Sequence, residues 1–171
     1  MCRLFATAAL SLLLLVLPAR AQEEPAGETE KPLVADPAND LFELAQLSYQ
    51  EALDEKNPKR RNDTLGVAIR QFERFREAYP KHENAVKSWY YTALCHRKLG
   101  DESTFRAHLN AIVTGWKKGP LVGAAAYQLA DELYKAEQWA KAEALYRLAA
   151  SESDNEASRH RSVYSLSLIH I

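Results

Sequence analysis

The sequence contains an internal repeat with a period of 37 residues, and this repeat constrains the fold more than any other feature. Three segments carry apolar residues at helical spacing, and their anchors, Ala68, Phe105 and Ala142, stand 37 residues apart. In each segment the residues four and seven positions after the anchor are also apolar, which places each set on one side of a helix. Because the alternation typical of strands is not sustained anywhere, the pattern predicts an all-α fold.

A second helix is expected before each of these segments. The three candidates are DLFELAQLSYQEALDEK, KSWYYTALCHRKLGD and AAAYQLADELYKAEQWAKA. In the first unit we expect a polar loop over residues 57–64, longer than its counterparts. Asn57-Pro58 ends the preceding helix because proline disfavours helical geometry in the residue before it, and Asp63 or Thr64 can cap the next helix.

The repeated pattern resembles the tetratricopeptide repeat family, over about residues 40–160. It departs from the family at Phe105, where a small residue is usual, and at Asp154, where proline is usual, and its period exceeds the family's ~34 residues. The resemblance implies an α-solenoid of antiparallel helix pairs, with about three units and the start of a fourth; an unrelated helical bundle is the alternative. The residues that carry the motif are Ala68, Phe72, Pro80, Trp89, Ala93, Gly100, Asp101, Leu129, Ala130, Ala142, Tyr146 and Ala149.

Residues 1–21 are predicted to be a signal peptide that is cleaved before Gln22. A basic start precedes an apolar run over residues 4–17, and Ala-Arg-Ala at 19–21 is a small-x-small cleavage site. The apolar run covers only ~21 Å as a helix, short of a ~30 Å hydrocarbon core, so stable membrane insertion is not expected. The mature protein is therefore expected to be periplasmic or secreted.

The rest of the chain divides into three segments. Residues 22–40 are acidic and contain proline without helical or strand periodicity, which predicts a disordered linker. Residues 41–165 form the expected repeat domain. The last six residues, 166–171, resemble the translation of an adapter used to build sequencing libraries, so we expect an artefactual tail on a truncated domain.

Composition argues against several function classes. The chain has 22 Lys and Arg against 23 Asp and Glu, a balance that does not favour nucleic-acid binding. No catalytic motif, phosphate-binding glycine loop or metal-binding spacing is found, so we expect no enzyme activity, no cofactor and no metal. Cys95, His96 and His108 would lack the further ligands that a metal site needs, and Cys95 is expected to be a small buried hydrophobe.

One face of each unit's first helix should pack on its second helix, while the opposite face is free to line a groove. Trp89, Ala93 and His96 are predicted on the packed face, and the first unit is aligned through Leu44-Ala45. The resemblance implies that the free positions contact a peptide ligand, and their aromatic and cationic residues favour a protein or peptide partner that carries carboxylates. These candidates are Phe42, Gln46, Tyr49, Gln50, Tyr90, Leu94, Arg97, Lys98, Tyr127, Asp131, Tyr134 and Lys135.

Three functions are compatible with this pattern. The resemblance favours a non-catalytic adaptor or scaffold of the cell envelope that binds peptide segments of partner proteins. The alternative is the helical solenoid that precedes the catalytic domain of a larger envelope enzyme, as in lytic transglycosylases. The third function is self-association through the repeats. For the predicted groove itself, the alternative is that some of its tyrosines fill the core between units.

Overall fold

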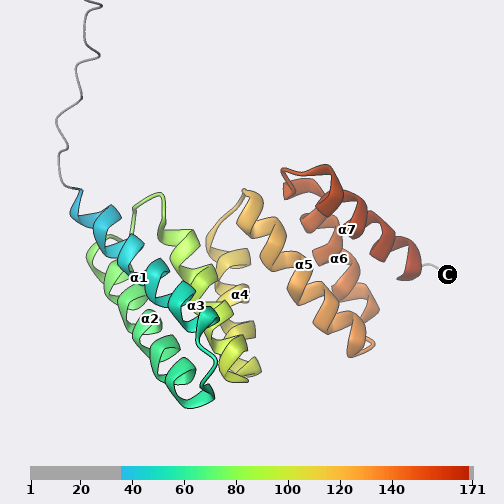
Figure 1. Ribbon diagram of the computed structural model, residues 1–171. Coiled ribbons are helices and arrows are strands. Elements are labelled where there is room, and N and C mark those ends of the chain that lie inside the picture. The colour runs from blue at the N-terminus through green and yellow to red at the C-terminus, as the bar shows by residue number, and fades with distance from the viewer. Residues whose placement is uncertain (1–35, 170–171) are drawn as a thin grey trace, which may run out of the picture. The chain divides into compact units, whose positions relative to one another are not determined.

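A computed structural model describes residues 36–169, which form seven α-helices and no strand (Figure 1). Each helix packs against its neighbours in sequence, most extensively within the pairs α1–α2, α3–α4 and α5–α6. Helix α1 also contacts α3, and α3 contacts α5, so odd-numbered helices adjoin one another. The helices are α1 (Pro37–Asp54), α2 (Pro58–Ala78), α3 (Ala85–Leu99), α4 (Glu102–Gly115), α5 (Pro120–Lys135), α6 (Trp139–Glu152) and α7 (Glu156–Ile169).

This architecture confirms the predicted all-α class and is consistent with a helical repeat or solenoid. The 37-residue period is also a period of burial, because the three anchors and the residues four and seven positions after them all face the interior. None of these nine side chains exposes more than 2% of its surface. They are Ala68, Phe72, Phe75, Phe105, Leu109, Ile112, Ala142, Tyr146 and Ala149.

The described residues include parts of the segments predicted at the two ends of the chain. The signal segment 1–21 lies outside the described residues, as does most of the linker 22–40. Helix α1 begins at Pro37 because the Asp36 side chain accepts hydrogen bonds from the first backbone N–H groups, so the last four linker residues are helical. Residues 166–169 of the predicted tail belong to α7. No helix in residues 36–169 has the length and apolarity to cross a membrane.

The polar loop predicted over residues 57–64 is wrong, because most of it is helix. Helix α2 begins at Pro58, and the Asn57 side chain caps it by accepting hydrogen bonds from the N–H groups of Lys59 and Arg60. Proline is favourable at the first helical position, since its missing N–H would have no partner there. Helix α1 already ends at Asp54, so Asn57-Pro58 start α2 and do not end α1, contrary to the sequence-based expectation.

The predicted Gly100-Asp101 turn is confirmed. Gly100 ends α3 with a φ of 81°, the left-handed conformation that glycine adopts without steric cost. The carboxylate of Asp101 caps α4 by accepting from the N–H of Thr104 at 3.1 Å. These two residues are the whole connection, so α3 and α4 pack as an antiparallel pair.

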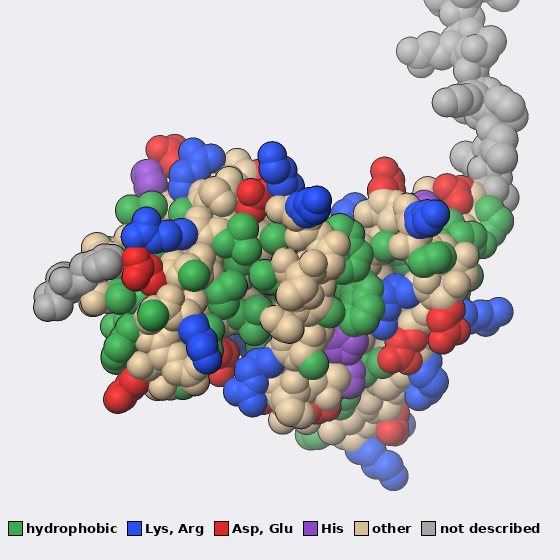
Figure 2. Space-filling model, turned by 180° about the vertical axis from the view of Figure 1, so that it is seen from behind, with side chains coloured by type: hydrophobic (Ala, Val, Ile, Leu, Met, Phe, Trp, Pro, Cys, Tyr) green, Lys and Arg blue, Asp and Glu red, His purple; other side chains and the backbone are tan. Residues whose placement is uncertain are grey.

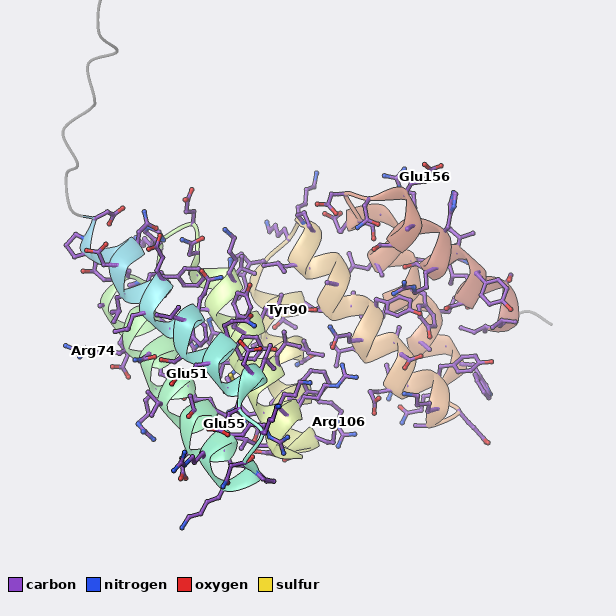
Figure 3. The ribbon with its side chains drawn as sticks, viewed as in Figure 1. Glu51, Glu55, Arg74, Tyr90, Arg106 and Glu156 are labelled. Carbon is purple, nitrogen blue, oxygen red and sulfur yellow. The ribbon has the colours of Figure 1, made fainter. Side chains whose placement is uncertain are left out.

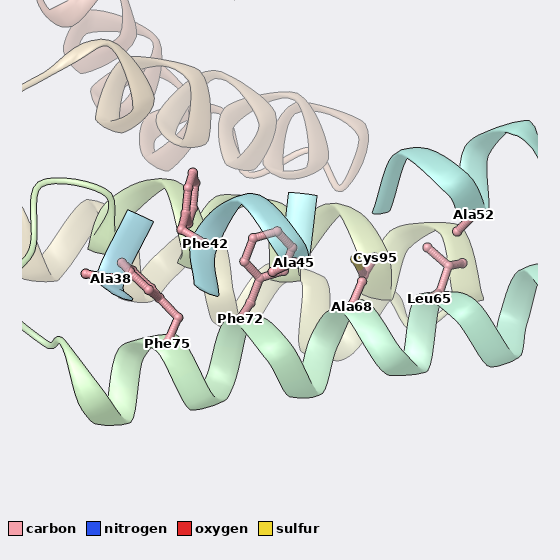
Figure 4. Packing of buried hydrophobic residues seen from close by; sticks show 9 residues of the cluster. All are labelled: Ala38, Phe42, Ala45, Ala52, Leu65, Ala68, Phe72, Phe75 and Cys95. Carbon is pink, nitrogen blue, oxygen red and sulfur yellow. The ribbon is translucent and has the colours of Figure 1, made fainter. Parts of the chain in front are cut away.

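The first pair encloses an aromatic core in which side chains of α1 meet those of α2 (Figure 4). The ring of Phe42 lies 5.9 Å from that of Phe72 and 5.3 Å from that of Phe75, and only 4% of Phe42 is exposed. Phe42 is thus a core residue and not part of a free face. Aligning the first unit through Leu44 misplaces it, because Leu44 is 49% exposed whereas Leu129, its supposed equivalent, is 9% exposed.

Candidate functional site

Three hollows follow one another across the odd-numbered helices, and shared tyrosines join them. The first hollow lies between α1 and α3, with a volume of about 420 Å³. The central hollow, about 520 Å³, lies between α3 and the start of α5 and shares Tyr91 with the first. The last hollow, about 420 Å³, lies among α3, α5 and α7 and shares Tyr90 with the central one. We call the three together the odd-helix groove.

The central hollow has apolar walls and cationic edges. Tyr90 and Tyr91 are consecutive on α3, and each also lines one of the two neighbouring hollows. Within residues 36–169, the only charged residues that line the central hollow are Lys87 and Lys118. The other apolar lining residues are Val86, Leu94, Pro120, Leu121 and Val122.

A hydrogen-bond chain between α3 and α5 fixes the wall that separates the central and last hollows. Gln128 donates to the hydroxyl of Tyr90 at 2.6 Å and accepts from the guanidinium of Arg97 at 3.2 Å. Figure 3 shows Tyr90 between these two helices. Burial raises the pKa of the Tyr90 hydroxyl, so it stays protonated at neutral pH. A tyrosine held in this way is a rigid contact for a ligand.

The last hollow is lined by polar groups from the α6–α7 turn and from α7. Arg161 reaches over the ring of Tyr127, 5.9 Å from its centroid, and Asp154 provides a charge of the opposite sign. The ring of Tyr127 lies edge-on to that of Tyr146, 5.5 Å away, which supports it from the core side. The remaining polar lining residues are Gln128, Ser153, Asn155, Ser158 and Ser162.

The structure brings together about half of the predicted groove residues. The first hollow contains Gln46, Tyr49 and Gln50, with the Tyr49 ring 5.4 Å from that of Tyr91. The central and last hollows contain Tyr90, Leu94 and Tyr127.

The other predicted residues do not line the groove. Asp131 and Lys135 pair with each other on α5 at 2.8 Å, and the Tyr134 ring contacts Trp139. Arg97 is linked to the groove only through its hydrogen bond to Gln128. The next residue, Lys98, is exposed. Phe42 belongs to the core.

The repeat pattern did not indicate the other groove residues, which lie at further positions of α1, α3 and α5, in the connections before α5 and α7, and on α7. Tyr91 lines both the first and the central hollow. Pro120 and Leu121 are the first residues of α5, directly after the connection from α4. A period-based alignment could not find them, because connections are where repeats differ. The Lys-Lys-Gly-Pro run at 117–120 was the available signal, since proline often opens a helix.

The face of α3 opposite the groove is packed, as predicted. Ala93 is fully buried, and the rings of Trp89 and His96 lie 5.0 and 5.3 Å from that of His108 on α4. The guanidinium of Arg76 on α2 covers the Trp89 ring at 4.5 Å. These ring contacts connect α2, α3 and α4 on the side of α3 that faces away from the groove.

Within residues 36–169 there is no group of three or more His, Cys, Asp or Glu side chains placed to hold a metal ion. The buried Cys95 packs in the α1–α2 core, as predicted, and burial raises the pKa of its thiol to about 12. Such a thiol is protonated and unreactive at neutral pH.

The surface shows no extended field of one sign on the side seen in Figure 2. Basic and acidic side chains alternate there around gathered hydrophobic ones.

No protein-family model matches the sequence, and no curated protein matches it.

Proposed function

We propose that this chain is a non-catalytic adaptor of the tetratricopeptide repeat type that is exported to the cell envelope and binds peptide segments of partner proteins in the odd-helix groove. The observation that carries the proposal is the succession of three hollows joined through Tyr91 and Tyr90. A succession of hollows suits an extended segment, because alternate side chains of one chain can enter successive sites.

The chemistry of the groove supports a peptide ligand. Rigid aromatic side chains dominate the binding energy of many protein interfaces, and Tyr90 and Tyr127 are held by neighbouring groups before any ligand binds. Backbone amides of a peptide need hydrogen-bond partners, which the serine, asparagine and glutamine side chains of the last hollow can provide. Lys87, Lys118 and Arg161 favour a ligand that carries carboxylates.

Export is the second part of the proposal, and it rests on the sequence of residues 1–21. When the full chain is expressed in a bacterium with an outer membrane, we expect it in the periplasmic or secreted fraction with Gln22 as its first residue. N-terminal sequencing of the recovered protein measures this directly. An intact Met1 terminus in the membrane pellet would contradict it.

The groove is tested with a peptide array and the double variant Tyr90→Ala/Tyr127→Ala. We expect the variant to bind the peptides selected by the wild type at least about tenfold more weakly, since each aromatic anchor is typically worth more than 1 kcal/mol. The matched control is Trp139→Ala/Tyr164→Ala, because both of these aromatic side chains are exposed and neither lines the groove. Circular dichroism verifies folding, and Leu94→Asp is a second groove variant. Equal binding by the folded groove variants would exclude this face as the binding site.

A further inference from the structure

The odd-helix groove changes the sign of its charge between α1 and α3. Among the described residues, Glu43 is the only charged one that lines the first hollow. Helix α1 as a whole contains four acidic residues, Asp40, Glu43, Glu51 and Asp54, and no Lys or Arg. The central hollow, in contrast, is lined by the two basic residues Lys87 and Lys118. The acidic and basic sections are adjacent because Tyr91 borders both hollows.

These charges are not neutralised by ion pairs within residues 36–169. The ammonium of Lys87 donates to the amide oxygen of Asn84 at 2.8 Å, which leaves its charge in place. Within the described part of the chain, Lys87, Lys118 and Glu43 form no ion pair with another side chain. A ligand can therefore meet each of them without first breaking a salt bridge.

We propose that the groove selects an ordered pattern in its peptide ligand: an apolar residue for the central hollow, an acidic residue next to it, and a basic residue on the side of α1. This inference rests on the proposed function, because it specifies the ligand of the same groove. The apolar walls of the central hollow take the apolar side chain, Lys87 and Lys118 attract the adjacent carboxylate, and Glu43 attracts the basic group.

The spacing of the pattern follows from helix packing. Packed helices lie about 8–10 Å apart, and the first and central hollows stand on either side of α3. An extended peptide advances about 3.3 Å per residue, so the basic residue should stand about three positions from the apolar one. The last hollow carries both Arg161 and Asp154 and adds no charge preference.

The experiment enriches a displayed library of random 12-residue peptides on the folded full chain and on two charge variants. We expect wild type to enrich an acidic residue beside the apolar anchor and a basic residue about three positions away. Lys87→Glu/Lys118→Glu should lower the enrichment of the acidic residue by about fivefold, as expected for exposed ion pairs. Glu43→Lys should lower only that of the basic residue. The control is Lys59→Glu/Lys141→Glu, which reverses two exposed lysines on even-numbered helices.

The outcomes separate this inference from the proposed function. If the selected peptides need Tyr90 and Tyr127 but show no ordered charges, or if the groove charge variants select the same peptides as the control, the pattern is overturned and the peptide groove stands. If no peptide is enriched, or if enrichment is unchanged by Tyr90→Ala/Tyr127→Ala, the proposed function fails and the pattern fails with it.

Discussion

The first and third helix pairs have the same connectivity but fill their interfaces with different side chains. Between α1 and α2 the core is aromatic, with the Phe42 ring in contact with those of Phe72 and Phe75, and with Tyr91 of α3 stacked on Phe72 at 5.5 Å. Between α5 and α6 Tyr146 is the one large aromatic side chain that is fully buried, and most of the other buried residues of the two helices are small. These small residues are Gly123, Ala125, Ala126, Ala130, Ala142 and Ala149.

The difference shows two solutions to one packing problem. Large side chains hold the first pair apart and contribute much apolar area, and its longer helices extend that contact. Small side chains let α5 and α6 approach closely, and a Cβ atom added at Gly123 would lie 3.1 Å from the backbone carbon of Glu152. We expect the first pair to be sensitive to lost volume and the third to added volume.

The largest expected effect is the loss of a buried ring from either pair. Phe72→Ala and Tyr146→Ala each remove a ring that is at most 1% exposed, and each should lower the free energy of unfolding by about 3–5 kcal/mol. Tyr146→Ala also removes a hydrogen bond with Ser165 of α7. Because each pair contacts only its neighbours, hydrogen exchange should rise mainly in the pair that carries the substitution.

Controls for these two variants are the exposed residues Val67 and Tyr164, whose replacement by alanine should have little effect. Urea denaturation gives the free energies, and hydrogen exchange gives the location. Uniform loss of protection along all helices after Phe72→Ala would show that the pairs unfold as one unit. An unchanged unfolding midpoint for Tyr146→Ala would contradict its place in the core.

A smaller loss of stability is expected at acidic pH, and it should arise in the α3–α4 pair. Burial, together with the charge of Arg76 and the nearby His96, lowers the pKa of His108 to about 4. The unfolded chain takes up this proton first, near the usual pKa of ~6.5, so the stability is fully present above that pH and is lost as pH falls toward 4. Because His108 is only half-buried, we expect a loss of roughly 1–2 kcal/mol.

The measurement is the free energy of unfolding between pH 7 and pH 5, for wild type and for His108→Gln. The substitution should flatten the pH dependence in this window. His160→Gln provides the control, since the His160 side chain is 72% exposed on α7. A slope that survives His108→Gln would assign the acid sensitivity to another group.

The smallest effect is expected from replacing two helical glycines by alanine, and the two changes in stability should have opposite signs. Gly66→Ala in α2 places its Cβ no closer than 3.6 Å to the flexible end of Arg70, so the gain in helix propensity should stabilise by up to about 1 kcal/mol. Gly123→Ala gains the same propensity but forces the backbone of Glu152 to move, and we expect a net loss of about 1 kcal/mol. Thermal unfolding measures both. Equal stabilisation would mean that α5 and α6 are not closely packed.

The buried face of each unit's second helix could be predicted from the sequence, although the start of α2 could not. Side chains at Phe72, Leu109 and Tyr146 stand at one position of the repeat and are all buried. The first helices were less predictable, because α1 has no turn that fixes its register against the period. One misaligned position was enough to exchange the buried and free faces at Phe42.

The candidate groove was predictable only where it follows the period. Tyr90 and Tyr127 stand 37 residues apart, and both line the last hollow. Tyr91, Leu121 and Arg161 entered the groove through contacts between helices that are distant in sequence. Such contacts depend on how the pairs stack, and a repeat pattern in one chain does not specify that.

The sequence by itself determined the helical class, the 37-residue period and the buried face of each second helix, because helical periodicity acts locally on every segment. The tertiary structure alone decided where α2 begins, on which side Phe42 lies, and which residues form the groove. Asn57-Pro58 illustrates the reason. Its local preferences suit both the end of one helix and the start of another, and the burial of Leu65 in the α1–α2 core favours the start of α2.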